Sequence, residues 1–335
     1  MAYTTIPKSS DYFNTKLYTG NGSSQALTGV GHQTDMVWIK SRTDTRKHNL
    51  YDVVRGVQKR IVPNDSVAED TVPGVTAFGT DGFTVGSETD TNGSARNFVG
   101  WSWKANGAGS ANTDGSISST VSASATSGFS IVSYTATGST ATIGHGLGSI
   151  PKMMIIKNTT SNSTWAVYNA SLGTGKFLRL QGTDAVGTEA NWFDTTPTSS
   201  VFTVGSNLPS GATIAYCFAD VQGFSKFGSY TGNGSGTDGT FVYTGFLPSF
   251  IMFKSTSTTG GWEIHDNKRD TFNPSSKRLF PNLSNAEATE NYVDFVSNGF
   301  KFRTNDANGN TNGTSYIYMA FAEEPLVGTN PATAR

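Results

Sequence analysis

The sequence predicts an all-β protein made of three tandem antiparallel β-sandwich repeats, jelly-roll-like in kind, and three observations lead to this. First, 38 of the 335 residues are Gly, Ser and Thr are also abundant, aromatic residues make up 12% and charged residues only 15%. Gly, Ser and Thr are poor helix formers, whereas Thr and aromatic side chains fit a pleated surface. Second, short apolar stretches alternate with Asn-Gly and Asp-Gly turns. Third, one ordered series of sequence anchors occurs three times.

The first anchor is a Tyr-Thr-Gly-Asn-Gly-Ser motif. It stands at 18–23, returns unchanged at 230–235, and has a looser copy at 134–139. An apolar strand that ends in Lys follows, with the Lys 22 to 24 residues after each Tyr. The three strands are Met36–Lys40, Met153–Lys157 and Phe250–Lys254.

The later anchors keep the same order in every copy. Twelve residues after each Lys comes an aromatic–acid or aromatic–amide pair, then a basic–apolar strand, a strand centred on Phe and a closing aromatic strand. The pairs are Tyr51-Asp52, Tyr168-Asn169 and His265-Asp266; the basic–apolar strands Lys59–Ile61, Lys176–Leu180 and Lys277–Phe280; the Phe strands Gly82–Gly86, Val201–Gly205 and Gly299–Phe302; the closing strands Phe98–Trp103, Ile214–Phe218 and Tyr316–Phe321.

These anchors divide the chain into residues 1–107, 108–223 and 224–335, called units 1, 2 and 3. Unit 2 begins with a stretch of linker composition, Ala105–Gly128, in which Ile117 and Val121 would allow an edge strand. Alternation in the closing strand Tyr316–Phe321 predicts two opposite faces. One helical turn is predicted at Ser284–Glu290 from capping-box spacing.

Charge and cysteine content exclude several classes of protein. With 24 Lys+Arg against 25 Asp+Glu the chain lacks the basic excess of a nucleic-acid-binding surface. The lone Cys217 excludes an intrachain disulfide framework and is expected to be a buried, inert thiol. The N-terminal residues Met1–Ser10 lack the apolar run of about 7–15 residues that marks a signal peptide, and no segment reaches the roughly 18 of a membrane span. We therefore expect synthesis in a cytoplasm and no membrane insertion.

The repeated Lys and acid positions are interpreted as structural. Asp52 and Asp266 recur, but the middle copy is Asn169, and a general acid or nucleophile would not survive as an amide. We expect each Lys to reach the acid or amide that follows it and so tie two strands together. The predicted ties join Lys40 to Asp52, Lys157 to Asn169 and Lys254 to Asp266.

Three other features have a chemical interpretation beside a structural one. Sugar-stacking platforms are one interpretation of Trp165, Trp192 and Trp262, although large aromatics more often form the core of a sandwich. The segment Asp306–Asn310 has the oxygen-rich alternation of a calcium loop, yet an Asn-Gly hairpin is preferred and no metal or cofactor is predicted. A glycosidase would need two paired carboxylates. The candidates are Asp44, Asp52, Asp65, Glu69, Asp70, Asp266, Glu287 and Glu290.

Several segments together resemble a repeat found in virion structural proteins of tailed bacteriophages, of the tail-fibre-like or minor structural kind. The resemblance covers nearly the whole chain. It implies a virion component made in the host cytoplasm, and it carries over no catalytic residue. The segments are Phe13–Lys40, Asp52–Gly56, Ala68–Thr71, Phe98–Lys104, Ser116–Ser139, Gly144–Lys157, Trp165–Tyr168 and Tyr316–Pro325.

The leading interpretation is accordingly a non-enzymatic virion structural protein, a tail-fibre-like or capsid-surface appendage that contributes to host attachment. Expected partners are other virion proteins and further copies of the chain, with a trimer favoured by analogy with phage fibres. A carbohydrate-binding receptor adhesin, with a host surface glycan as partner, is the first alternative. A surface-polysaccharide depolymerase is the second.

Overall fold

The computed structural model describes residues 4–188 and 193–325, and this part of the chain is almost entirely antiparallel β-structure. Its helical segments are η1 (Ser9–Asp11) and α1 (Thr89–Asn92). The helical turn predicted at Ser284–Glu290 is wrong. There the main chain bonds to unit 1 instead, since Arg46 N donates to Ser284 O and Glu287 N to Arg42 O.

Three groups of four strands, called the central sheets, share one strand order. In each, the closing strand lies second and the Lys-ended apolar strand third, and the predicted strands at these places are confirmed. The groups are β1 (Phe13–Thr19), β9 (Asn97–Trp103), β3 (Met36–Ser41) and β4 (Asn49–Asp52); β12 (Phe129–Ala136), β18 (Gly211–Phe218), β14 (Met153–Asn158) and β15 (Ala166–Asn169); β19 (Ser225–Thr231), β26 (Ser315–Glu324), β21 (Leu247–Ser255) and β22 (Trp262–Asp266).

A second, peripheral sheet accompanies each central sheet, and the predicted Phe-centred strand is an inner strand of it in units 1 and 3. Pairing of this strand with the strand after the Tyr motif is common to all three units. The peripheral sheets are β2 (Gln25–Thr28), β8 (Gly82–Val85) and β7 (Val75–Gly79); β13 (Ala141–Gly144) and β17 (Val201–Val204); β20 (Phe241–Tyr243), β25 (Gly299–Phe302), β24 (Ala288–Val296) and β23 (Ser275–Arg278).

Unit 2 differs from the others in its first segment. The stretch with linker composition forms β10 (Ser110–Asn112) and β11 (Ser119–Ser124), which extend the central sheet of unit 2 beyond β12. With β16 (Leu178–Arg179) at the other edge, that sheet has seven strands. In unit 1 the basic strand β5 (Lys59–Arg60) pairs with β6 (Asp70–Thr71).

Both faces of every central sheet are buried, because one faces the unit's own core and the other faces the remaining units. On β26, Tyr316, Tyr318 and Ala320 belong to the core of unit 3. Ile317, Met319 and Phe321 belong to a larger core shared by all three units. The two predicted faces of this strand are thus confirmed, and neither is solvated.

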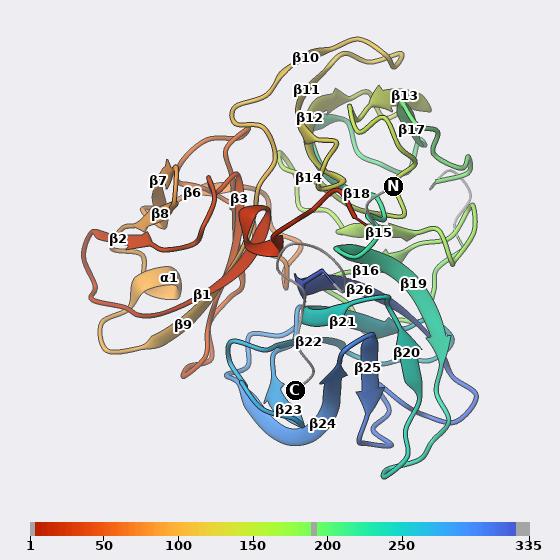
Figure 1. The fold of residues 1–335 in the computed structure, drawn as a ribbon. Helices are drawn as coiled ribbons and strands as arrows, with labels where there is room; N and C mark the ends of the chain where they lie inside the picture. The colour runs from red at the N-terminus through yellow and green to blue at the C-terminus, as the bar shows by residue number, and fades with distance from the viewer. Residues whose placement is uncertain (1–3, 189–192, 326–335) are drawn as a thin grey trace.

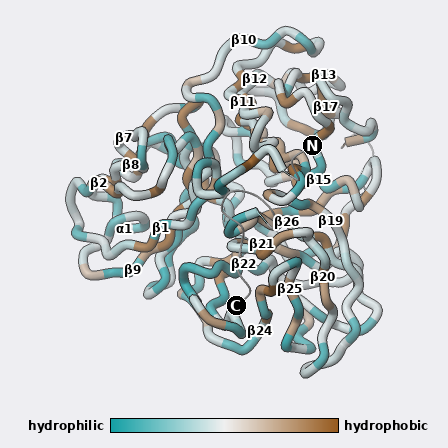
Figure 2. Tube along the Cα trace, viewed as in Figure 1, coloured by the Kyte–Doolittle hydropathy of each residue, from teal (hydrophilic) through white to brown (hydrophobic). Residues whose placement is uncertain are grey.

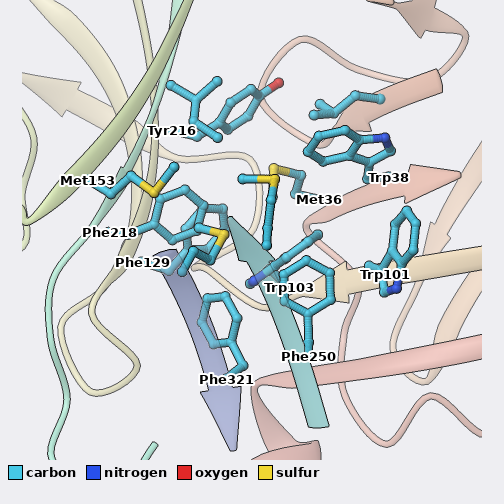
Figure 3. Packing of buried hydrophobic residues seen from close by; sticks show 14 of the residues in the cluster. Met36, Trp38, Trp101, Trp103, Phe129, Met153, Tyr216, Phe218, Phe250 and Phe321 are labelled. Atoms are coloured by element: carbon cyan, nitrogen blue, oxygen red, sulfur yellow. The ribbon is translucent and has the colours of Figure 1, made fainter. Parts of the chain in front are cut away.

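The shared core lies where the three lobes of the molecule meet (Figure 1). Hydrophobic segments follow the strands, while the outer loops are largely hydrophilic (Figure 2). Figure 3 shows aromatic rings and methionines from different units converging, and Phe250 lies within 5.5–6.2 Å, between ring centroids, of Phe13, Trp103 and Phe321. Aromatic packing therefore holds the units in one body.

Candidate functional site

The contacts between neighbouring units, called seams, contain the repeated lysines. Lys40, Lys157 and Lys254 are all fully buried. Among the described residues, none of the three ammonium groups hydrogen-bonds to the repeated acid or amide, so the predicted ties are wrong. The carbonyl acceptors are Ser41 for Lys40 (2.8 Å), Ser66, Ser161 and Ser163 for Lys157 (3.1, 3.3 and 3.0 Å) and Ser255 for Lys254 (2.6 Å).

Strand register explains why the lysines miss the acids. Asp52 lies opposite Met36, and Asp266 lies opposite Phe250, at the first of the five residues that end in Lys. At a rise of about 3.3 Å per residue, the lysine stands about 13 Å further along the strand. The antiparallel pairing therefore separates the two charges that the linear sequence suggested were partners.

Burial lowers the pKa of the three lysine ammonium groups. Loss of hydration lowers the pKa of each from its ordinary value of 10.5 to about 8. Carboxylates oppose each shift: Asp90 and Asp44 of unit 1 and Glu287 of unit 3 act on Lys40, Asp65 of unit 1 acts on Lys157, and Asp184 of unit 2 acts on Lys254. Each seam thus holds one buried lysine whose lost hydration is only partly offset by nearby acids.

The repeated acids are held by arginines three residues further on. Arg55 Nε donates to Asp52 Oδ2 at 2.6 Å, and Arg269 Nε donates to Asp266 Oδ2 at 2.5 Å. Both carboxylates are fully buried. The Asp-x-x-Arg spacing is visible in the sequence, and it identifies arginine, not lysine, as the partner of each repeated acid.

A second acid and a donor from the next unit complete each network. In unit 1, Arg55 also donates to Glu69 at 2.9 Å, and Tyr216 of unit 2 donates its hydroxyl to Asp52 at 2.7 Å. In unit 3, Arg269 donates to Glu287 at 3.2 Å, and the Trp101 indole of unit 1 donates to Asp266 at 3.0 Å. Burial raises the pKa of Tyr216 well above its ordinary value, so this hydroxyl remains a donor.

Unit 2 carries an apolar version of the same arrangement. Asn169 replaces the acid, Leu172 replaces the arginine and Val186 replaces the second acid. Met319 stands on β26 where Tyr216 and Trp101 stand on β18 and β9, as the strand registers show. Leu172 and Val186 pack against the shared core.

Two main-chain hydrogen bonds are common to all three seams. In the first bond, the carbonyl of the residue two places after the repeated Lys accepts from a backbone N–H of the neighbouring unit. In the second, the N–H of the residue six places after the same Lys donates to a carbonyl of that unit, three residues before the first bond's donor. The bonds, each 2.8 or 2.9 Å long, are Glu69 N to Thr159 O and Ser163 N to Ser66 O; Val186 N to Thr256 O and Gly260 N to Thr183 O; Glu287 N to Arg42 O and Arg46 N to Ser284 O.

The tryptophans proposed as glycan platforms are seam residues. Trp165 and Trp262 are fully buried, so neither ring offers a face to a sugar, and this interpretation is wrong for both. Trp165 Nε1 donates to Val62 O of unit 1 at 3.0 Å, and Trp262 Nε1 donates to Arg179 O of unit 2 at 2.9 Å. The third candidate, Trp192, lies outside the described residues.

Histidine takes the place of tryptophan at the third seam. His48 stands eight residues after the repeated Lys of its unit, as Trp165 and Trp262 do in theirs. Its Nδ1 accepts from the Trp38 indole at 2.8 Å, which leaves the proton on Nε2 to be donated to Phe280 O of unit 3 at 2.9 Å. The three ring donors therefore run in one direction around the molecule, from unit 2 to 1, 1 to 3 and 3 to 2.

A buried asparagine explains the repeated Tyr-Thr-Gly-Asn-Gly-Ser motif. Asn92 Nδ2 donates to Asn21 Oδ1 and Ser23 O, and Asn310 Nδ2 makes the same two bonds to Asn233 and Ser235. Sequence reasoning missed both residues, although each stands six places before the first aromatic of its closing strand. The Asp306–Asn310 segment thus holds the Tyr-Thr-Gly-Asn-Gly-Ser motif of unit 3 in place through Asn310.

The described residues contain no group of three or more His, Cys, Asp or Glu side chains arranged to hold a metal ion. Asp306, the first oxygen of the suggested calcium loop, accepts from the Tyr292 hydroxyl at 2.7 Å. Of the glycosidase candidates, Asp52 and Asp266 are buried and paired with arginine. Cys217 is a buried free thiol, as predicted, and burial raises its pKa to about 12.

Comparison with protein families adds one finding. Residues 8–325 match the family described as "Domain of unknown function (DUF7483)". The chain belongs to this family. The match spans all three units, so the DUF7483 domain corresponds to the three units together and not to one of them. No curated protein and no solved structure matches the chain.

Three hollows of this DUF7483 domain differ in character. Where the three units meet, a void of about 10 Å³ is lined by hydrophobic side chains, including Met36, Phe218 and Phe250, and is too small for a ligand. Two surface hollows of about 420 and 410 Å³ both lie in or beside unit 3. Neither helical segment of the described chain is long enough to cross a membrane.

Proposed function

We propose that the chain is a non-enzymatic structural protein of a tailed-phage virion, a tail-fibre-like or capsid-surface component. In this proposal its three units are tandem jelly-roll-like β-sandwiches with boundaries near residues 107 and 223. Those boundaries fall between β9 and β10 and between β18 and β19. The likeness to virion structural proteins seen in the sequence supports the setting, and the seams support the structural role.

The observation that carries the proposal is where the repeated positions are used. Lys40, Asp52, Lys157, Asn169, Lys254 and Asp266 are all buried. They lie in or beside contacts between units, and the same pair of main-chain bonds closes every seam. Residues repeated for a reaction would have to meet a substrate, whereas residues repeated for assembly have to meet one another. The second pattern favours a rigid building block.

Self-association remains part of the proposal. The three units of one chain already supply a threefold arrangement, so the expected trimer would be a trimer of such rings. Sedimentation equilibrium of the purified full-length chain would give its mass. A monomer at all concentrations would remove the trimer from the proposal and leave the virion role standing.

Location on a particle tests the proposal directly. Phage particles produced by a host that carries this gene would be purified and probed with a specific antibody under the electron microscope. We expect label at one repeated place on intact particles, and we expect the protein in their mass-spectrometric inventory. Particles that lack the protein altogether would overturn the virion role.

The two alternatives separate by simple assays. A depolymerase would release sugar from host envelope, but the repeated acids Asp52 and Asp266 are buried against Arg55 and Arg269, which does not favour it. A receptor adhesin is favoured by one observation, an exposed tyrosine beside a polar hollow in unit 3. This observation carries a proposal of its own.

A further inference from the structure

Unit 3 differs from units 1 and 2 in the exposed residues of its peripheral sheet. Strand β20 carries two exposed aromatic residues, Phe241 and Tyr243, on either side of the buried Val242. Strand registers align β20 with β2 and β13 through the Phe-centred strand of each unit. The residues at the two aromatic positions are Ala26 and Thr28 in unit 1 and Thr142 and Gly144 in unit 2.

Packing accounts for only one of these two rings. The Phe241 ring covers Gly299 on the next strand, where an added Cβ would lie 3.0 Å from its edge. Such an aromatic cover over a strand glycine stabilises a sheet. Tyr243 is 57% exposed, and its hydroxyl has no hydrogen bond within the described residues. The sandwich of the other units is built without an aromatic here, so Tyr243 needs another explanation.

Tyr243 forms one side of the 410 Å³ surface hollow between β20 and the segment that enters β19. Asp220, Gln222 and Lys226 also line it, and small residues form the remainder. One of these, Ser225, is held in place because its Oγ donates to Ala219 O at 3.2 Å. The hollow is therefore a fixed surface that combines one aromatic face with a carboxylate, an amide and an ammonium group.

The polar groups of this hollow retain unused hydrogen-bonding capacity. Asp220 Oδ1 accepts from Phe227 N at 2.9 Å, which fixes the carboxylate and leaves Oδ2 available. Partial burial raises the pKa of Asp220. Within the described residues, the side chains of Gln222 and Lys226 have no hydrogen-bond partner. The repeated carboxylates of the seams, by contrast, are paired with arginines.

We propose that this hollow is a carbohydrate-binding site. The face of an aromatic ring is electron-rich and attracts the polarised C–H groups on one face of a pyranose. Asp220 then accepts from sugar hydroxyls, Lys226 donates to them, and the Gln222 amide does both. A shallow, preformed surface with one aromatic side and a few converging polar groups suits a terminal sugar of a larger glycan.

This proposal does not rest on the virion role, because a sugar site is compatible with any extracellular or cytoplasmic setting. The recognised chemistry is shared by free monosaccharides and by glycans on a cell surface. The test therefore uses the purified full-length chain in two arms. One arm is an array of immobilised glycans, and the other is titration with the corresponding free monosaccharides, followed by the chemical shifts of labelled tyrosine.

The expected result is binding that depends on Tyr243. The variant Tyr243→Ala should weaken binding about tenfold or more, and Tyr243→Phe should keep most of it because the ring remains. Phe272→Ala is the matched control, because Phe272 is an 81% exposed aromatic of the same unit that does not line the hollow. Thermal melting of each variant verifies the fold.

Two outcomes would overturn the proposal. The first is no binding in either arm, and the second is equal loss in the Tyr243→Ala and Phe272→Ala variants. Binding to immobilised glycans with no response to monosaccharides would keep the site and assign it to the larger surface glycan. Since particle location is measured separately, failure here leaves the proposed virion role intact.

Discussion

The seam networks of units 1 and 3 are ionic, whereas the corresponding place in unit 2 is apolar. Asp52, Arg55 and the half-buried Glu69 form a group that receives a hydrogen bond from a neighbouring unit. In unit 2 an amide and two aliphatic side chains stand there, and the donor has become Met319. All four positions have changed together.

The comparison shows which interactions a seam requires. Burying an ion pair costs much hydration, and the attraction between the charges offsets that cost only when every partner is present. The chain therefore contains either the complete charged group or none of it. What never varies is the pair of main-chain bonds and the aromatic and aliphatic packing of the shared core. These common features hold the units together, and the charges are an optional addition.

The largest expected effect comes from breaking one ionic network. Asp266→Ala removes the acceptor of both Arg269 Nε and the Trp101 indole, and leaves the arginine buried. We expect the free energy of unfolding to fall by about 3–5 kcal/mol. Asn169→Ala, at the matching place in unit 2, should cost only about 0.5–1.5 kcal/mol. Denaturant unfolding followed by tryptophan fluorescence measures both, and equal losses would refute the distinction.

A smaller, pH-dependent effect should come from the seam lysines. In the folded chain the pKa of Lys254 is about 8, whereas an unfolded lysine titrates near 10.4. Between these values the unfolded state binds more protons, so stability rises with pH, by up to about 1.4 kcal/mol per unit. Below pH 8 lysine is charged in both states, and its contribution is constant.

The variant Lys254→Met isolates this contribution. Its unfolding free energy, measured from pH 7 to pH 10, should rise less steeply above pH 8 than that of the parent chain, by up to about 1.4 kcal/mol per pH unit, because only Lys40 and Lys157 still contribute. The exposed Lys268→Met is the control and should follow the parent chain. A parent and a Lys254→Met variant with parallel pH profiles would contradict the lowered pKa of this buried ammonium group.

Local pattern was enough to predict the strands. Apolar alternation, turn residues and repeated order identified the closing strand Tyr316–Phe321, and both faces of it are confirmed. The helical turn at Ser284–Glu290 failed because its main chain bonds to Arg42 and Arg46, residues more than two hundred positions away. Capping-box spacing is a local signal, and such long-range contacts override it.

The seams could not be predicted from one unit at a time. Lys40 and Asp52 are near in sequence and equally repeated, yet the register places them at opposite ends of paired strands. Trp165 was ambiguous for a similar reason, since composition does not show whether a large ring faces solvent or another unit. The sequence does contain one signal. Asn169 and Leu172 differ together from the Asp and Arg at the same places in units 1 and 3, and those two residues hydrogen-bond to each other there.

The smallest expected effect, and the sharpest test of the comparison, comes from converting one seam into the other kind. Arg55→Leu alone should cost about 3–5 kcal/mol, because Asp52 and Glu69 lose their shared partner. Combining it with Asp52→Asn, Glu69→Val and Tyr216→Met reproduces the apolar group of unit 2. We expect this fourfold variant to unfold within about 1–2 kcal/mol of the parent chain.

In the fourfold variant no charged group or hydroxyl of the network is left without its partner, because all four are replaced together. The main-chain bonds from Glu69 N to Thr159 O and from Ser163 N to Ser66 O are untouched, since backbone atoms alone form them. Equilibrium unfolding of the single and fourfold variants in one buffer gives the comparison. If the fourfold variant is less stable than Arg55→Leu, the charges are required at this seam, and the apolar seam of unit 2 depends on features beyond these four positions.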